Sequence, residues 1–145
     1  MQAKKITTQT ELNQAFDIRK EVFVHEQGVP LEDEFDAFDQ LDAPCEHVLV
    51  VDQDQAVGTG RLRFVEGVGK LERICILKPF RSKGIGKIII QKLEELAVEN
   101  NMSSVKLHGQ THAEGFYRKL GYETASEEFL EDGIPHVLML KKFNQ

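Results

Sequence analysis

The pattern of apolar and polar positions predicts a strand and then a helix in the first part of the chain. Residues 3–8 carry a weak strand signal, and Thr10 is the predicted N-cap of the helix. Apolar residues then recur near the helical period as far as residue 26, and Gly28 ends the pattern. The stretch 31–44 is acidic and rich in turn-forming residues, which predicts a loop.

The rest of the chain alternates apolar runs with turn residues. Strands are predicted over 46–52, 56–65, 69–77, 104–109, 122–129 and 136–142. Helices are predicted over 84–99, where apolar residues line one face, and over 112–120. The resulting order, β-α-β-β-β-α-β-α-β-β, predicts an α/β (α+β) fold in which helices flank a mixed central sheet of about six to seven strands.

Composition and charge narrow the class of protein. The chain has 145 residues, 41% of them apolar, which suits one domain over residues 1–145 with a single core. Lys and Arg number 18 against 24 Asp and Glu, and the net charge of −6 disfavours nucleic-acid binding. No apolar stretch approaches the roughly 20 residues that span a bilayer, and the first residues lack the apolar core of a signal peptide. We therefore expect a cytoplasmic protein that binds no membrane.

The cysteines and histidines give no sign of a disulfide or a metal site. Cys45 and Cys75 do not belong to a C-x-x-C pair, and the histidines do not fall at zinc-ligand spacing. Cys75 lies in an apolar strand, where cysteines mostly pack, so a covalent acyl-enzyme on its thiol is disfavoured.

The most informative segment covers residues 77–86. A strand ends, a basic loop follows, and a helix begins at once. The free N–H groups and the dipole at a helix N-terminus favour an anion, and Gly84 and Gly86 leave a phosphate room to approach the backbone. Positive charge around the loop comes from Arg81, Lys83 and Lys87. A tight turn without a ligand is the alternative, and neither the dinucleotide fingerprint nor a Walker loop is present.

Two motifs together resemble the GNAT superfamily of N-acetyltransferases. Residues 81–86 (RSKGIG) fit its pyrophosphate-loop pattern Q/R-x-x-G-x-G/A, and residues 113–122 (AEGFYRKLGY) resemble its A-x-x-F-Y-x-x-x-G-F segment. Residues 19–27 with the following Val29-Pro30, and residues 131–136 (EDGIPH), resemble segments of the YjcF/ElaA-like acetyltransferases. The resemblance covers nearly the whole chain.

The resemblance implies that acetyl-CoA is the cosubstrate and that no metal takes part. Acetyl-CoA would lie in a V-shaped opening between two splayed parallel strands, with its pyrophosphate on the loop before the long helix. Its pantetheine arm would pair with the backbone of a strand edge. The residues implied in binding it are Ile74, Cys75, Ile76, Arg81, Ser82, Lys83, Gly84, Ile85, Gly86, Lys87, Phe116 and Lys119.

The resemblance also implies direct attack of an amine on the thioester. Glu72 matches the general base that takes the amine's proton, and a carboxylate paired with a nearby arginine is the alternative. Tyr117 matches the general acid that protonates the departing thiolate, and a tyrosine that packs the last helix on the sheet is its alternative. A backbone N–H near Ile74 would stabilise the oxyanion.

The acceptor side is less defined. The acidic stretch 31–44 would attract a cationic amine, and a solvated loop is its alternative. The residues implied in binding the acceptor are Arg19, Phe23, Glu26, Gln27, Asp36 and His136.

These features predict an acetyl-CoA-dependent N-acetyltransferase that acts directly on a primary amine of an unidentified small molecule or protein. Dimers are common in the family, so a homodimer is a candidate state. One alternative is a non-catalytic acyl-CoA-binding sensor of the same fold. Another is an acyltransferase like the acyl-homoserine-lactone synthases, which the lack of any Trp disfavours. A nucleotide phosphate binder is a third.

Overall fold

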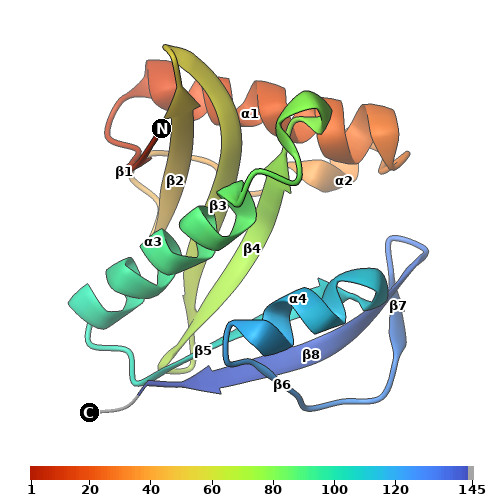
Figure 1. Ribbon diagram of the computed structural model, residues 1–145. Coiled ribbons are helices and arrows are strands. Elements are labelled where there is room, and N and C mark those ends of the chain that lie inside the picture. Colours follow the sequence, from red (N-terminus) through yellow and green to blue (C-terminus); the bar gives the residue numbers. More distant parts are fainter. Residues whose placement is uncertain (144–145) are drawn as a thin grey trace.

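The computed structural model of the chain describes residues 1–143 (Figure 1). The strands are β1 (Gln2–Lys5), β2 (Cys45–Asp52), β3 (Gln55–Val65), β4 (Val68–Ile76), β5 (Ser104–Gln110), β6 (Glu123–Thr124), β7 (Phe129–Glu131) and β8 (Ile134–Lys142). The helices are α1 (Gln9–Arg19), α2 (Leu31–Glu34), α3 (Ile85–Glu99) and α4 (Glu114–Lys119), with the π-helical η1 (Lys20–Glu26) and the 3-10 turns η2 (Lys78–Phe80) and η3 (Thr111–Ala113).

Within residues 1–143 the strands form one eight-stranded sheet. The order is β1-β2-β3-β4-β5-β8-β6, with β7 paired to β8. β4 and β5 run parallel, and the other pairs are antiparallel. The mixed sheet with its flanking helices confirms the predicted α/β (α+β) class. It has more strands than expected because the predicted strand 122–129 forms two short strands, β6 and β7, that pair separately with β8.

Helices cover both faces of the sheet. α3 packs on one face, where Ile89 shares a buried cluster with Val48 of β2. α1 packs on the opposite face, where Leu12 shares a second cluster with Leu49. Neighbouring residues of β2 enter different clusters because side chains alternate between the faces of a strand. α4 lies on the face of α3, since Tyr117 packs against the α3 cluster.

The N-cap of α1 is Thr8 and not the predicted Thr10. Thr8 has an extended backbone, and its hydroxyl accepts a hydrogen bond from the Glu11 N–H at 3.2 Å. The Glu11 carboxylate in turn accepts one from the Thr8 N–H at 3.2 Å, which completes a capping box. At its other end α1 continues directly into η1, so the predicted helix to residue 26 is an α-helix followed by a π-helical segment.

The two halves of the sheet separate beyond a short parallel contact. β4 and β5 pair only from Gly69 with Val105 to Leu71 with Leu107. β4 then bulges against β3 at Arg73, whose φ of 55° lies in the left-handed region. A bulge bends a strand and increases its twist, and beyond this point β4 and β5 diverge (Figure 1).

Candidate active site

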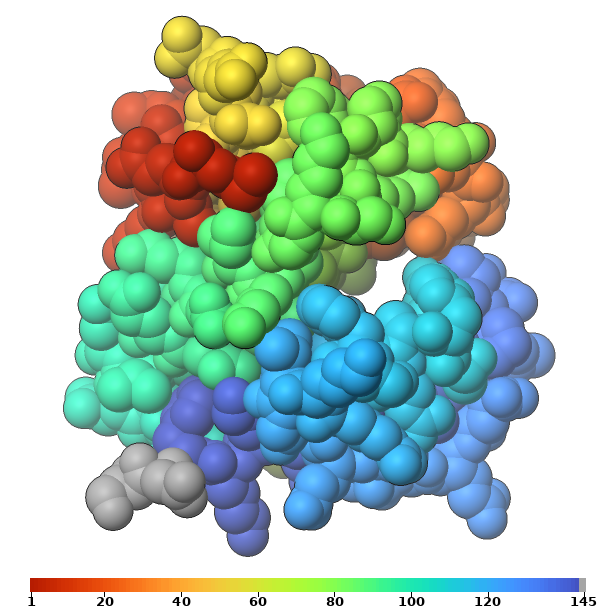
Figure 2. All heavy atoms as spheres, in the orientation of Figure 1, coloured from red at the N-terminus to blue at the C-terminus, as the bar shows by residue number. Residues whose placement is uncertain are grey.

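The space between the diverging strands forms a cleft of about 800 Å³, here called the interstrand cleft. Its walls come from β4, β5, η1, α4, the loop before α3 and the turn between β7 and β8. Figure 2 shows the surface hollowed between the green segment that leads into α3 and the cyan segment around α4. The volume lies within the range of small-ligand sites.

The loop before α3 presents free backbone N–H groups to this cleft. Gly84 is the N-cap of α3, with a φ of 79° that favours glycine and no side chain to cap the first N–H groups. A Cβ at Gly84 would meet no atom within 4 Å, so the backbone is open to a ligand. Lys83 and Lys87 are exposed beside it. The loop therefore has the geometry and charge of an anion site.

Gly86 lines the cleft and also serves packing. A Cβ at Gly86 would lie 3.2 Å from the ring of Phe116 and 3.6 Å from the Ile76 side chain, so the glycine lets α4 approach α3. Phe116 lines the cleft and is 41% exposed. Lys119, also expected to bind the cofactor, is exposed on α4 and is not part of the cleft wall.

Arg81 crosses from the loop toward η1. Its Nε donates to the Ile76 carbonyl at 3.0 Å, and its Nη2 pairs with Glu26 Oε1 at 2.9 Å. The structure thus joins a residue predicted to bind the cofactor to one predicted to bind the acceptor. Arg81 is also part of the cleft wall.

The edge of β4 toward the cleft carries the backbone groups of Ile74 and Ile76. The Leu77 N–H donates to the Val57 carbonyl on β3 at 2.9 Å. The N–H and C=O groups of Ile76, the residue before it, therefore point away from β3. Backbone groups alternate between the two edges of a strand, and Ile74 therefore faces the same way as Ile76. Cys75, between them, packs its side chain in the α1 cluster. Burial raises the pKa of its thiol, which disfavours a nucleophilic role.

Tyr117 brings a free hydroxyl into the cleft. Its ring lies 3.2 Å from where a Cβ would stand on Gly109, and Phe116 packs on it in a T-shaped pair at 5.2 Å. The hydroxyl has no hydrogen-bond partner within residues 1–143, and no buried polar atom in this part of the chain lacks one, so the hydroxyl reaches open space. Burial of the ring raises the pKa of Tyr117 to about 12.

Glu72 lines the same cleft but is fully engaged. One of its oxygens accepts from Arg61 at 2.7 Å and from Arg63 at 2.8 Å, and the other pairs with Lys70 at 3.1 Å. Burial alone would raise its pKa, yet the charge and hydrogen bonds of Arg61 hold the pKa of Glu72 down to about 2. This is the arginine pairing that the sequence left open, and it makes a poor proton acceptor.

Two residues expected at the acceptor site, Arg19 and Asp36, belong instead to a buried ion network. Arg19 is 1% exposed and pairs with Glu34 at 3.0 Å and with Asp39 at 2.6 Å. Asp36 accepts from Arg61, likewise 1% exposed, at 2.8 Å. The carboxylates of Glu34, Asp36 and Asp39 in the acidic stretch therefore pair with the buried arginines of α1 and β3. The residues that engage its carboxylates come from distant parts of the chain, which the sequence did not indicate.

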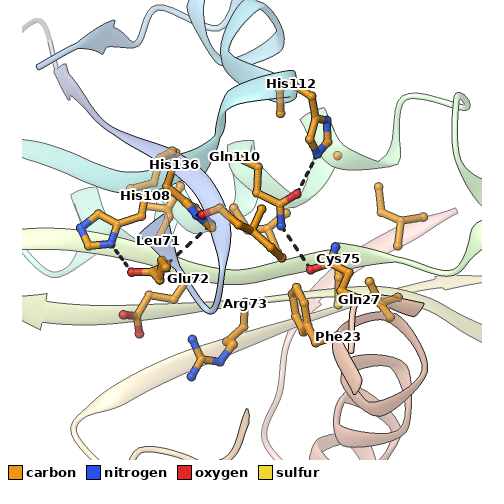
Figure 3. A pocket seen from close by; sticks show the side chains of 18 of the residues that line it. Phe23, Gln27, Leu71, Glu72, Arg73, Cys75, His108, Gln110, His112 and His136 are labelled. Atoms are coloured by element: carbon orange, nitrogen blue, oxygen red, sulfur yellow. Dashed lines mark hydrogen bonds and ion pairs between the residues drawn. The ribbon is translucent and has the colours of Figure 1, made fainter. Parts of the chain in front are cut away.

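Other predicted acceptor residues do reach the cleft. Phe23 of η1 and Gln27, the residue that follows η1, line it. Gln27 Oε1 accepts from Gln110 Nε2 at 3.2 Å, and Gln110 Oε1 contacts His112 Nε2 at 2.7 Å. This chain of polar groups spans the opening between η1 and the end of β5 (Figure 3).

His136 also lines the cleft, and it arrives with two residues that the sequence did not single out, His108 and Glu131. The Nδ1 of His108 lies 2.8 Å from Glu131 Oε1, and the Nε2 of His136 lies 3.7 Å from Glu131 Oε2. Figure 3 shows the two imidazoles side by side on the cleft wall. The alternation of side chains in residues 104–109 and the EDGIPH turn were the available signals.

Within residues 1–143, no three His, Cys, Asp or Glu residues are arranged to hold a metal ion. None of the helices described is long and apolar enough to cross a membrane.

Known proteins with a similar sequence or fold include acetyltransferases. Residues 5–143 match the family model described as an acetyltransferase (GNAT) domain. The chain is similar to two Bacillus subtilis proteins, YyaT (56% identity over 145 residues, 100% of this chain and 98% of that one) and the N-acetyltransferase YjcF (47% over 142 residues, 97% and 99%). Its fold is similar to an acyl-CoA N-acyltransferase from Pseudomonas aeruginosa (TM-score 0.86, 27% identity) and to Escherichia coli ElaA (TM-score 0.86, 24% identity), each covering 97% of this chain and 99% of the other.

Proposed function

Since the chain belongs to the GNAT family of acetyltransferases, as its motifs predicted, we propose that it is an acetyl-CoA-dependent N-acetyltransferase acting directly on a primary amine. The interstrand cleft carries this proposal. An open helix N-terminus, an unpaired strand edge and a free tyrosine hydroxyl all face it. Each is a group that binding or cleaving a CoA thioester requires.

The residues of the loop fit the pyrophosphate of a CoA ester. The first N–H groups of α3 have no cap, Gly84 leaves the approach open, and Lys83 and Lys87 supply charge at the rim. Arg81 stands close enough to the loop to join them once it leaves Glu26, its partner at 2.9 Å. An exposed ion pair of this kind contributes little and exchanges readily.

The edge of β4 fits the extended, amide-bearing arm of the same molecule. Ile74 and Ile76 direct backbone groups to this edge, which within residues 1–143 has no strand partner beyond Leu71, and where Arg81 donates to the Ile76 carbonyl at 3.0 Å. An extended ligand adds to such an edge as another strand would. The N–H of Ile74, next to the bulge at Arg73, would then donate to the oxygen that gains negative charge as the thioester is attacked.

Tyr117 would act on the leaving sulfur. Its hydroxyl is protonated at neutral pH, because burial raises the pKa of Tyr117 to about 12, and it is free to donate. A hydrogen bond from the phenol stabilises the charge that develops on sulfur as the C–S bond breaks. The acceptor amine is favoured by exposed carboxylates on the cleft wall, among them Asp33 and Asp132.

The test is the release of free thiol from acetyl-CoA by the purified chain. Spermidine, glucosamine, kanamycin and Nα-acetyl-lysine amide serve as the amines, and mass spectrometry identifies the acetylated product. We expect thiol release that depends on the amine and matches product formation. Binding of acetyl-CoA without thiol release for any of the four amines would contradict transfer and favour a CoA-ester sensor.

A further inference from the structure

The two faces of β5 present different chemistry to the interstrand cleft. Gly109 lies against the ring of Tyr117, on the face covered by α3 and α4. Because side chains alternate along a strand, His108 lies on the opposite face. On β4, Leu71 enters the α3 cluster and Glu72 points to that same opposite face. An amine that approaches from the side away from Tyr117 therefore meets Glu72 and His108.

His108 is held by a neighbour on the β7–β8 hairpin. Its Nδ1 lies 2.8 Å from Glu131 Oε1. The other oxygen of Glu131 lies 3.7 Å from His136 Nε2, while His136 Nδ1 contacts the Ile134 carbonyl at 2.6 Å. The Phe129 ring packs on both imidazoles, with centroids 5.1 Å from His108 and 6.1 Å from His136. This packing fixes the ring of His108 in one orientation.

The contact with Glu131 decides which nitrogen of His108 is free. A carboxylate accepts the Nδ1–H, so the neutral ring carries its lone pair on Nε2. The side chain of His108 is 29% exposed and lines the cleft. His136 is 8% exposed, and both of its nitrogens face protein groups. Of the two imidazoles, only that of His108 has a nitrogen without a partner among residues 1–143.

Glu72, the carboxylate that β4 places on this face, has no such freedom. Its oxygens pair with Arg61, Arg63 and Lys70, and its side chain is 9% exposed. The side chain of Glu131 is 43% exposed, and its ion pairs in the described part of the chain are with His108 and His136. Because both oxygens of Glu72 are paired, we expect a proton from an ammonium ion in the cleft to be accepted by His108 and not by Glu72.

We infer that His108 is the general base of the acetyl transfer and that Glu131 is the positioning residue that orients it. This inference rests on the proposed function. An acceptor ammonium gives one proton to His108 Nε2, directly or through one water, and His108 passes it to solvent. The amine nitrogen then forms the C–N bond as the C–S bond breaks. Tyr117 donates a proton to the sulfur and regains, through water, the second proton that the nitrogen loses.

The experiment compares His108→Gln with the wild type using two nucleophiles, the fastest of the four amines above and hydroxylamine. An alkylamine is protonated at neutral pH and needs a base, whereas hydroxylamine is already neutral there. We expect kcat with the alkylamine to fall by about 10² to 10⁴-fold, and kcat with hydroxylamine to fall far less. Glu131→Gln should show the same dependence on the nucleophile.

The matched control is His25→Gln, since the side chain of His25 is 64% exposed on η1 and its polar contact within residues 1–143 is with Glu21. It should keep wild-type rates with both nucleophiles, and acetyl-CoA affinity should be unchanged in all three variants. A wild-type kcat in His108→Gln, or an equal loss with both nucleophiles, would overturn the inference and leave His108 a structural residue. No thiol release by the wild type with any amine would instead overturn the proposed function itself.

Discussion

Replacing Tyr117 with phenylalanine is expected to lower kcat for acetyl transfer by about a hundredfold or more while acetyl-CoA still binds. The hydroxyl lies in the interstrand cleft and has no hydrogen-bond partner within residues 1–143. Its removal therefore leaves no buried polar group without a partner. Phenylalanine keeps the ring, which packs against Gly109 and Phe116. The loss would therefore fall on the step that cleaves the C–S bond, and steady-state thiol release at saturating acetyl-CoA and amine measures it.

Tyr122→Phe is the matched control. Tyr122 is buried, is not part of the cleft wall and donates its hydroxyl proton to Glu94 at 2.7 Å. Its substitution should cost about 1 kcal/mol of stability, the net value of a hydrogen bond, and leave kcat unchanged. Equal kcat values for the wild type and Tyr117→Phe would remove Tyr117 from the reaction.

Replacing Arg61 with methionine is expected to lower the free energy of unfolding by about 3 to 5 kcal/mol. Arg61 is 1% exposed and binds Asp36, Asp39 and Glu72 at 2.7 to 3.1 Å. Methionine fills part of the space, but the three carboxylates lose the positive charge with which they pair. The pKa of Glu72, now about 2, would rise, and the segment between α2 and β2 would lose its attachment to β3. Urea unfolding at neutral pH measures the change.

Arg118→Met provides the comparison for a surface arginine. Arg118 is 61% exposed on α4 and pairs with Glu114 at 3.1 Å, so its loss should cost less than about 1 kcal/mol. If the two variants unfolded at the same urea concentration, the ion network would contribute no more than an ordinary surface pair.

The loop that we propose for the cofactor was predicted from the sequence because its features are local. Residues 81–87 are consecutive, and the turn, the helix start and the basic side chains all follow from their order. The capping box at Thr8 was equally local, since Glu11 stands three residues after it, and choosing Thr10 overlooked that signature. The strands and helices were found for the same reason, through their short periods.

The partners of Arg19 and Asp36 could not be predicted in this way. Arg19 pairs with Asp39, and Arg61 on β3 binds both Asp36 and Glu72. These contacts depend on how the segment after η1 folds back over the sheet, which no local pattern encodes. Carboxylates that look alike in the sequence were therefore assigned to the acceptor.

The role that we infer for His108 on β5 was not predicted from the sequence, for a related reason. Strand periodicity places His108 on one face, but the partner that gives it chemical meaning, Glu131, arrives through the β7–β8 hairpin. In the sequence, the EDGIPH turn was marked for its resemblance and for His136, and Glu131 was given no role. It took the pairing of β5 with β8 to bring the two segments into one wall of the cleft.

The most direct test is a calorimetric titration with acetyl-CoA on the wild type, Gly84→Glu and Gly67→Glu. Gly84 and Gly67 have φ values of 79° and 80°, and a Cβ at either would meet nothing within 4 Å. Both substitutions therefore impose the same backbone strain, but only Gly84→Glu places a carboxylate at the N-terminus of α3.

We expect the wild type and Gly67→Glu to bind acetyl-CoA and Gly84→Glu to lose binding. At a ligand concentration 100 times the Kd, acetyl-CoA should also stabilise the first two proteins by about 2.7 kcal/mol. Equal binding by Gly84→Glu and Gly67→Glu, or no binding by the wild type at millimolar acetyl-CoA, would contradict the loop before α3 as the site of the cosubstrate.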